Sequence, residues 1–114
     1  MNNVRWFELG TILSMTTGYN CTNDFNKVWD LVWFICDDKF INSFGLGMVK
    51  NGIKKHILSL YPELKKIKYN KGESVDDFVS LLKEKFGDYL PLVKIGDELP
   101  LEYKNDQEEV SKHR

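Results

Sequence analysis

The chain has 114 residues, 42% of them hydrophobic and 29% charged, a composition typical of one globular domain rather than of a disordered or membrane-embedded chain. The net charge of −1 excludes a histone-like protein that coats nucleic acid, and two cysteines are too few for a disulfide scaffold. Only two of the sixteen basic residues are arginines, which argues against a sequence-specific DNA reader because arginine supplies the bidentate contacts to guanine.

The N-terminal third of the chain predicts a short extended segment followed by two helices. Residues 4–7 are apolar and aromatic and fit a strand or a docked arm, and residues 8–15 predict a short helix that Gly18 ends. A second helix is expected to be capped by Thr22 or Asn23 and to run to about residue 36. Its apolar stripe makes it the predicted centre of the fold. The stripe consists of Phe25, Val28, Trp29, Val32, Ile35 and Cys36, whereas Leu31, Trp33 and Phe34 fall outside it.

The rest of the chain predicts two further helices and one extended segment. A third helix is expected over residues 46–61, ending at Pro62 because the residue before a proline avoids helical angles. A fourth helix follows Ser74 as its N-cap and stops at Gly87. Residues 89–95 predict an edge strand, since Pro91 cannot sit in a central strand.

These elements predict an α+β fold, mostly α, with about four helices packed around the second one. A small edge sheet of two or three strands would come from residues 4–7, 67–69 and 89–95. Residues 1–96 form the expected single domain, and the acidic segment 97–114 is predicted to be a disordered tail. The start of the chain lacks the apolar region of a signal peptide, and no apolar run could span a bilayer. We therefore expect a cytoplasmic protein with no membrane partner.

No pattern of residues indicates catalysis, a metal or a cofactor. The histidines are 57 positions apart, and no metal-ligand spacing or phosphate loop is present. A cysteine nucleophile would need Cys36 or Cys21 near His56, but Cys36 lies on the apolar stripe, where a free cysteine behaves as a small hydrophobe. We expect a protein that is not an enzyme and carries no metal or cofactor.

Aromatic residues outside the predicted apolar stripes form the first candidate surface. Trp33 shares a helix face with Asp30 and Asp37, and Trp6 and Phe44 fall at positions that the helical pattern leaves exposed. Exposed tryptophan is enriched at protein interfaces because it buries a large rigid surface. These five residues are therefore candidates for contact with a partner, unless a neighbouring segment covers them.

Residues 50–71 form the second candidate surface, with seven lysines, one acidic residue and a net charge of +6. Such a stretch can dock nucleic acid or another anionic surface. It can also be a solvated face that the acidic C-terminal third of the chain balances, and we favour this second interpretation. The candidate basic patch consists of Lys50, Lys54, Lys55, Lys65, Lys66 and Lys68.

The hexapeptide Leu13-Ser14-Met15-Thr16-Thr17-Gly18 resembles the Leu-Ser-x-Thr-Thr-Gly signature of a small family of uncharacterised bacteriophage proteins. The resemblance implies a phage origin and no particular activity. Matching pieces span residues 6–95, at 28–34, 37–40, 58–62 and 89–93. The hydroxyls of Ser14, Thr16 and Thr17 can bond helix-end carbonyls beside the turn at Gly18, or they can bind a partner or small ligand. We favour the structural role.

Together these features lead to two main hypotheses, and a third, an enzyme with an unfamiliar site, would need turnover of a substrate that is abolished by changing His56 or Cys36. The first is a small phage accessory protein that binds a host protein, for example a defence nuclease complex, and inhibits a host defence system as an anti-CRISPR protein does. The alternative is a module that binds nucleic acid or a nucleotide signal through residues 50–71.

Overall fold

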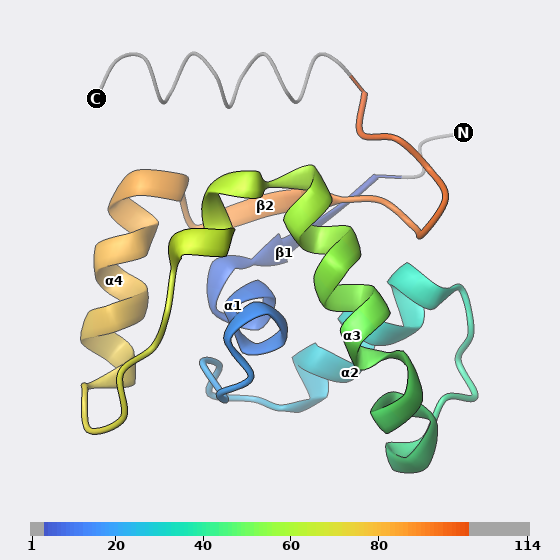
Figure 1. Ribbon diagram of the computed structural model, residues 1–114, viewed down its shortest axis with the longest axis horizontal. Coiled ribbons are helices and arrows are strands. Elements are labelled where there is room, and N and C mark those ends of the chain that lie inside the picture. Colours follow the sequence, from blue (N-terminus) through green and yellow to red (C-terminus); the bar gives the residue numbers. More distant parts are fainter. Residues whose placement is uncertain (1–3, 101–114) are drawn as a thin grey trace.

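The structure, a computed structural model, describes residues 4–100 and is mostly helical with one small sheet (Figure 1). The elements in chain order are β1 (Arg5–Glu8), α1 (Leu9–Thr17), α2 (Asn26–Cys36), α3 (Ser43–Leu60), the 3₁₀ helix η1 (Pro62–Lys66), α4 (Val75–Phe86) and β2 (Tyr89–Leu92). The predicted class, α+β and mostly α with about four helices, is confirmed for this part of the chain.

The two ends of the described chain meet in the sheet. β1 and β2 pair antiparallel, with Phe7 opposite Leu90. Side chains of α3 and of the residue after it bond to β2 and to the residue that follows β2: the Tyr61 hydroxyl donates to the carbonyl of Pro91 at 2.6 Å, and His56 Nε2 donates to the carbonyl of Val93 at 2.7 Å. The predicted pairing of the two terminal segments is confirmed. Residues 67–69 form no strand, so the sheet has two strands and not three.

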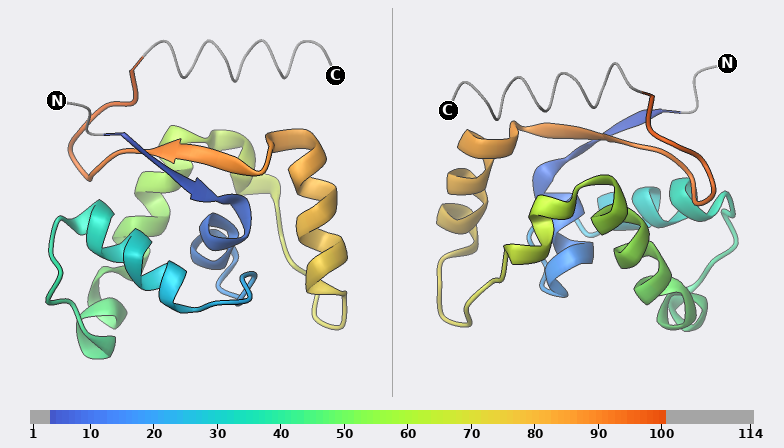
Figure 2. Two further views of the ribbon diagram at one scale, coloured as in Figure 1. Left: turned by 180° about the vertical axis from the view of Figure 1, so that it is seen from behind. Right: turned by 45° about the horizontal axis from the view of Figure 1, so that its top comes forward.

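α1 packs against each of the other three α-helices, whereas α2 packs mainly against α1 and α3 (Figures 1 and 2). Seven of the nine residues of α1 are buried. Small side chains alternate with its large apolar ones, so other segments of the chain can pack closely against several faces of the helix. A Cβ at Gly10 would lie only 2.5 Å from the carbonyl oxygen of Cys21. The expected central position of the second helix is therefore not confirmed.

The second helix begins later than the cap at Thr22 or Asn23 predicted, at Asn26. Between α1 and α2 the side chains of Asn20, Thr22 and Asp24 each accept a hydrogen bond from the backbone N–H two residues on. Such local bonds stabilise turns in competition with a helix. The buried face of α2 also differs from the predicted apolar stripe. Leu31, which the pattern places outside the stripe, is fully buried, whereas Phe25, which the pattern places in it, is 46% exposed.

The third helix begins three residues earlier than predicted. The side chain of Asn42 accepts a hydrogen bond from the N–H of Gly45 at 3.0 Å and caps α3 at Ser43. The earlier start adds a turn that lies outside the core, and Ile53 is the first buried residue of the helix. The predicted N-cap of the fourth helix, Ser74, is confirmed, since its hydroxyl accepts from the N–H of Asp77.

The predicted boundary between domain and tail, after residue 96, lies within the described part of the chain. Leu99 is buried in the core although it lies beyond residue 96. Residues 101–114, most of the predicted tail, lie outside the described residues.

Candidate binding surfaces

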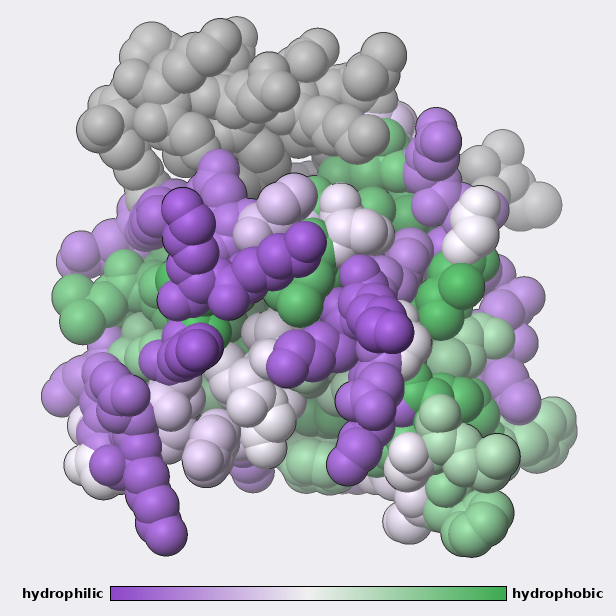
Figure 3. Space-filling model, viewed as in Figure 1, coloured by the Kyte–Doolittle hydropathy of each residue, from purple (hydrophilic) through white to green (hydrophobic). Residues whose placement is uncertain are grey.

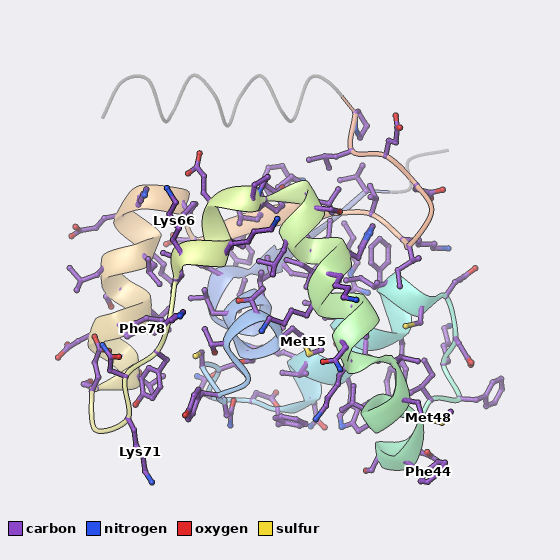
Figure 4. The ribbon with its side chains drawn as sticks, in the orientation of Figure 1. Met15, Phe44, Met48, Lys66, Lys71 and Phe78 are labelled. Atoms are coloured by element: carbon purple, nitrogen blue, oxygen red, sulfur yellow. The ribbon has the colours of Figure 1, made fainter. Side chains whose placement is uncertain are left out.

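The most exposed large apolar side chains lie where α2 connects to α3. Phe40 is 93% exposed, Phe44 80% and Met48 75%. Phe44 and Met48 are one helical turn apart and share a face of α3. Figure 4 shows both at the corner of the molecule farthest from α4, and pale green atoms mark this corner in Figure 3. We call Phe40, Phe44 and Met48 the apolar corner.

A groove adjoins the apolar corner and brings together three of the five predicted partner residues. Asp30, Trp33 and Asp37 line it, together with Phe34 and Phe40, and its volume is about 780 Å³. Phe40 lines the groove as well, and a short loop connects it along the chain to α3, which carries Phe44 and Met48. The fourth predicted residue, Phe44, lies on the apolar corner, and the fifth, Trp6, is 52% exposed in β1 away from the groove lining.

Trp33 and Asp37 hold the loop that presents Phe40. Trp33 is half-buried, and its indole Nε1 donates to the carbonyl of Ile41 at 3.0 Å. Asp37 ends α2 in the left-handed conformation, with φ of 53°, and its carboxylate accepts a hydrogen bond from Lys94 at 3.0 Å. Both residues therefore position the surface as well as lining the groove.

The lysines of the basic patch spread over three segments on one side of the molecule. Three lie on α3, two on η1, and Lys68 lies in the connection to α4. Within residues 4–100 none of the six forms an ion pair; the pairs found there join Lys27 to Glu8 and Lys94 to Asp37. Figure 3 shows hydrophilic side chains crossing this face, and Figure 4 places Lys66 and Lys71 at the two ends of the segment before α4.

The signature turn is bonded within the fold. Ser14 Oγ donates to the carbonyl of Gly10 and accepts from the N–H of Cys21 at 2.8 Å. The hydroxyls of Thr16 and Thr17 both donate to the carbonyl of Leu13, and Gly18 adopts φ of 82°. These bonds clamp the loop after α1 onto the helix.

Folding also brings the signature turn to the basic patch, which the sequence did not predict. Ser14, Thr17 and Gly18 line a cavity of about 310 Å³ whose opposite wall carries Lys50 and Lys54 of α3. The sequence pattern also gave no prediction of a site at the aromatic residues of this cavity, Tyr19 and Phe25, or at Phe40 and Met48 of the apolar corner. The four-residue spacing of Phe44 and Met48 would indicate a shared helix face. The predicted helix begins at residue 46, however, and so does not include Phe44.

Within residues 4–100, neither cysteine is hydrogen-bonded to His56, whose Nε2 donates to the carbonyl of Val93. Burial raises the pKa of the Cys21 thiol, although a hydrogen bond with Thr17 acts in the opposite direction. Burial and the nearby carboxylate of Asp38 raise the pKa of the Cys36 thiol. Both thiols therefore stay protonated at neutral pH, which is the unreactive form. In the described part of the chain, no group of three or more histidine, cysteine or acidic residues could hold a metal ion.

Comparison of the chain with protein-family models, curated proteins and solved structures finds no match. Among residues 4–100, no helix is both long and apolar enough to cross a membrane.

Proposed function

We propose that this protein acts by binding another protein, and that the apolar corner enters an apolar pocket of that partner. The exposure of Phe40, Phe44 and Met48 is the observation that carries the proposal. Large apolar side chains gathered on one exposed surface are typical of interaction sites. Within the described residues, nothing else of this chain covers them.

The energy available from the apolar corner is substantial but not sufficient alone. Burying a large apolar side chain contributes roughly 1.5–3 kcal/mol, so three contribute roughly 5–9 kcal/mol. Association itself costs about 4–15 kcal/mol in lost freedom of motion. The adjoining groove, lined by Trp33 and Asp30, would supply the further contacts. We therefore expect a partner that covers both the apolar corner and the groove.

The biological setting of this proposal follows from the resemblance of residues 13–18 to phage proteins. In that setting the chain acts in the host cytoplasm without catalysis, and its partner is a host defence protein, as for an anti-CRISPR inhibitor.

The contact surface is tested by comparing three forms of the full chain as bait in a host lysate. Phe44→Ser with Met48→Ser removes the apolar side chains that α3 presents at the corner, and Leu81→Ser is the matched control because Leu81 is an exposed apolar residue on α4. We expect one stoichiometric partner with the wild type and the control, and at least about a tenfold loss with the double variant, since residues at the centre of an interface dominate affinity. Equal capture by all three forms would contradict the proposal.

Two further measurements distinguish a foreign partner from self-association and test the biological setting. A dimer of this chain that the double variant converts to monomer would assign the apolar corner to self-association and would contradict the proposal. Phage plating on bacteria that carry a defence system tests the setting. Protection by the wild type and by Leu81→Ser, but not by the double variant, would support an inhibitor.

The lysines without ion pairs favour a second candidate function, binding of nucleic acid. An electrostatic contact with phosphates weakens steeply as salt rises, because binding releases counterions. The triple variant Lys65→Gln, Lys66→Gln, Lys68→Gln should then lower both the affinity for an oligonucleotide and the salt dependence. Binding that does not depend on salt would remove this candidate.

A further inference from the structure

The 310 Å³ cavity between α1 and α3 has walls that are fixed before any ligand arrives. One wall is the end of α1, closed by the bonds of Ser14 and Thr17. The rim continues into the 18–25 loop, which three successive turns hold in place. The opposite wall is α3. Preformed concave sites of this kind are typical of small-molecule binding.

The charge of the cavity favours an anion. Lys50 and Lys54 are one helical turn apart on α3, so both ammonium groups lie on the same side. Among residues 4–100, no carboxylate lines the cavity and neither lysine forms an ion pair. The groove beside the apolar corner differs, because three aspartates offset its basic residues. Lysine binds phosphate as a compact point charge.

The remaining lining favours a flat apolar body attached to that anion. Met15, Val28 and Leu46 contribute apolar surface. Two aromatic side chains also line the cavity, Phe25 and Tyr19. They are 46% and 45% exposed, so part of each ring is open to solvent at the cavity. Tyr19 already packs against Tyr69, with ring centroids 4.9 Å apart, so Phe25 offers the ring on which a nucleobase can stack and Tyr19 borders that position.

We propose that this cavity binds a nucleoside monophosphate, with the phosphate toward Lys50 and Lys54 and the base against Phe25 and Tyr19. The size sets the limit of one nucleotide, since about 310 Å³ lies at the lower end of the ~300–1,000 Å³ found for ligand pockets. Asn20 and Asn51, which line the same cavity, carry amide groups that can contact the ribose or the base edge. The site is independent of the apolar corner.

The test is calorimetric titration of the full chain with AMP, GMP, CMP and UMP, combined with chemical-shift mapping by NMR. Adenosine and inorganic phosphate are titrated in parallel. The variant Lys50→Gln with Lys54→Gln removes the charge of the cavity, and Lys65→Gln with Lys66→Gln removes the same charge from η1. The variant Phe25→Leu removes the ring while keeping an apolar side chain. Circular dichroism checks that each variant is folded.

We expect at least one monophosphate to bind and to shift the resonances of residues 14–20 and 46–54. The cavity variant should lose about tenfold or more in affinity, which is about 1.4 kcal/mol or more, because it removes both cations of the cavity, and the η1 variant should lose less than about twofold. Adenosine and inorganic phosphate should each bind more weakly than AMP by a similar factor. Phe25→Leu should weaken AMP while leaving inorganic phosphate unchanged.

Three results would overturn the inference. They are no binding of any monophosphate at millimolar concentration, equal losses in the two lysine variants, and AMP binding no tighter than inorganic phosphate. A final arm identifies the source of the nucleotide. A 5′-phosphorylated oligonucleotide that shifts the same resonances more tightly than AMP would assign the cavity to the end of a nucleic acid, and a weaker effect would assign it to the free nucleotide. Both results uphold the cavity as a nucleotide site.

Discussion

The same substitution, glycine to alanine, should change stability in opposite directions in α1 and α3. Gly52 lies inside α3 and an added Cβ would meet nothing within 4 Å. Gly52→Ala should therefore gain about 0.5–1 kcal/mol from lower backbone entropy in the unfolded chain. Gly10 lies in α1, where a Cβ would come within 2.5 Å of the backbone oxygen of Cys21.

That contact cannot be relieved cheaply, because Ser14 bonds both the carbonyl of Gly10 and the N–H of Cys21. Displacing the loop would strain or break this clamp, so the cost of overpacking, about 1–3 kcal/mol, should exceed any gain in helix propensity. We expect Gly10→Ala to lower the free energy of unfolding and to differ from Gly52→Ala by about 1–3 kcal/mol, since the gain in helix propensity is common to both substitutions. Urea unfolding at pH 7, followed by tryptophan fluorescence under reducing conditions, measures both variants. Equal changes, or a Gly10→Ala protein at least as stable as the wild type, would refute the reasoning.

Three further predictions concern hydrogen bonds that side chains make to the backbone. Tyr61→Phe should cost about 1–3 kcal/mol at pH 7 by leaving the carbonyl of Pro91 without this donor. Burial raises the pKa of Tyr61 above its ordinary value of 10, so above pH 10 the unfolded chain loses this proton first and stability falls as pH rises. The difference in unfolding free energy between wild type and Tyr61→Phe should then shrink by about 1.4 kcal/mol per pH unit above pH 10, and a constant difference would count against it. Ser14→Ala should cost about 1–3 kcal/mol in urea unfolding, because the buried N–H of Cys21 loses its acceptor, whereas Ser59→Ala at an exposed site should cost under about 0.5 kcal/mol. Trp33→Phe should cost about 1 kcal/mol and speed hydrogen exchange in residues 38–42, which its indole anchors, and unchanged exchange there would refute the anchoring role.

Elements with strong local signals were predictable from the sequence. Ser74 and Gly87 bound α4 as predicted, because a side-chain cap and a terminal glycine act within one turn of the chain. The stop at Gly18 and the end of α3 before Pro62 follow from the same kind of backbone constraint. Where two local signals compete, the sequence does not show which one prevails. The turns at Asn20, Thr22 and Asp24 prevailed over the predicted start of α2.

The candidate surfaces were predictable only as separate pieces. The surplus of lysines in residues 50–71, the signature hexapeptide and the position of Phe44 are all visible in the chain. That Lys50 faces the turn at Gly18 across one cavity is a contact between segments more than 30 positions apart, which no local pattern encodes.

The sequence by itself determined the class of fold, the turns that bound its helices and the separation of charge along the chain, since each depends on neighbouring residues. Tertiary structure alone decided that α1 packs against all the other α-helices, because its small residues matter only once other segments pack against them. It also decided that Trp33 is an anchor, whereas Phe40, Phe44 and Met48 are left exposed. The physical reason is that burial is a property of the packed chain: a side chain is covered or exposed according to which distant segment lies over it.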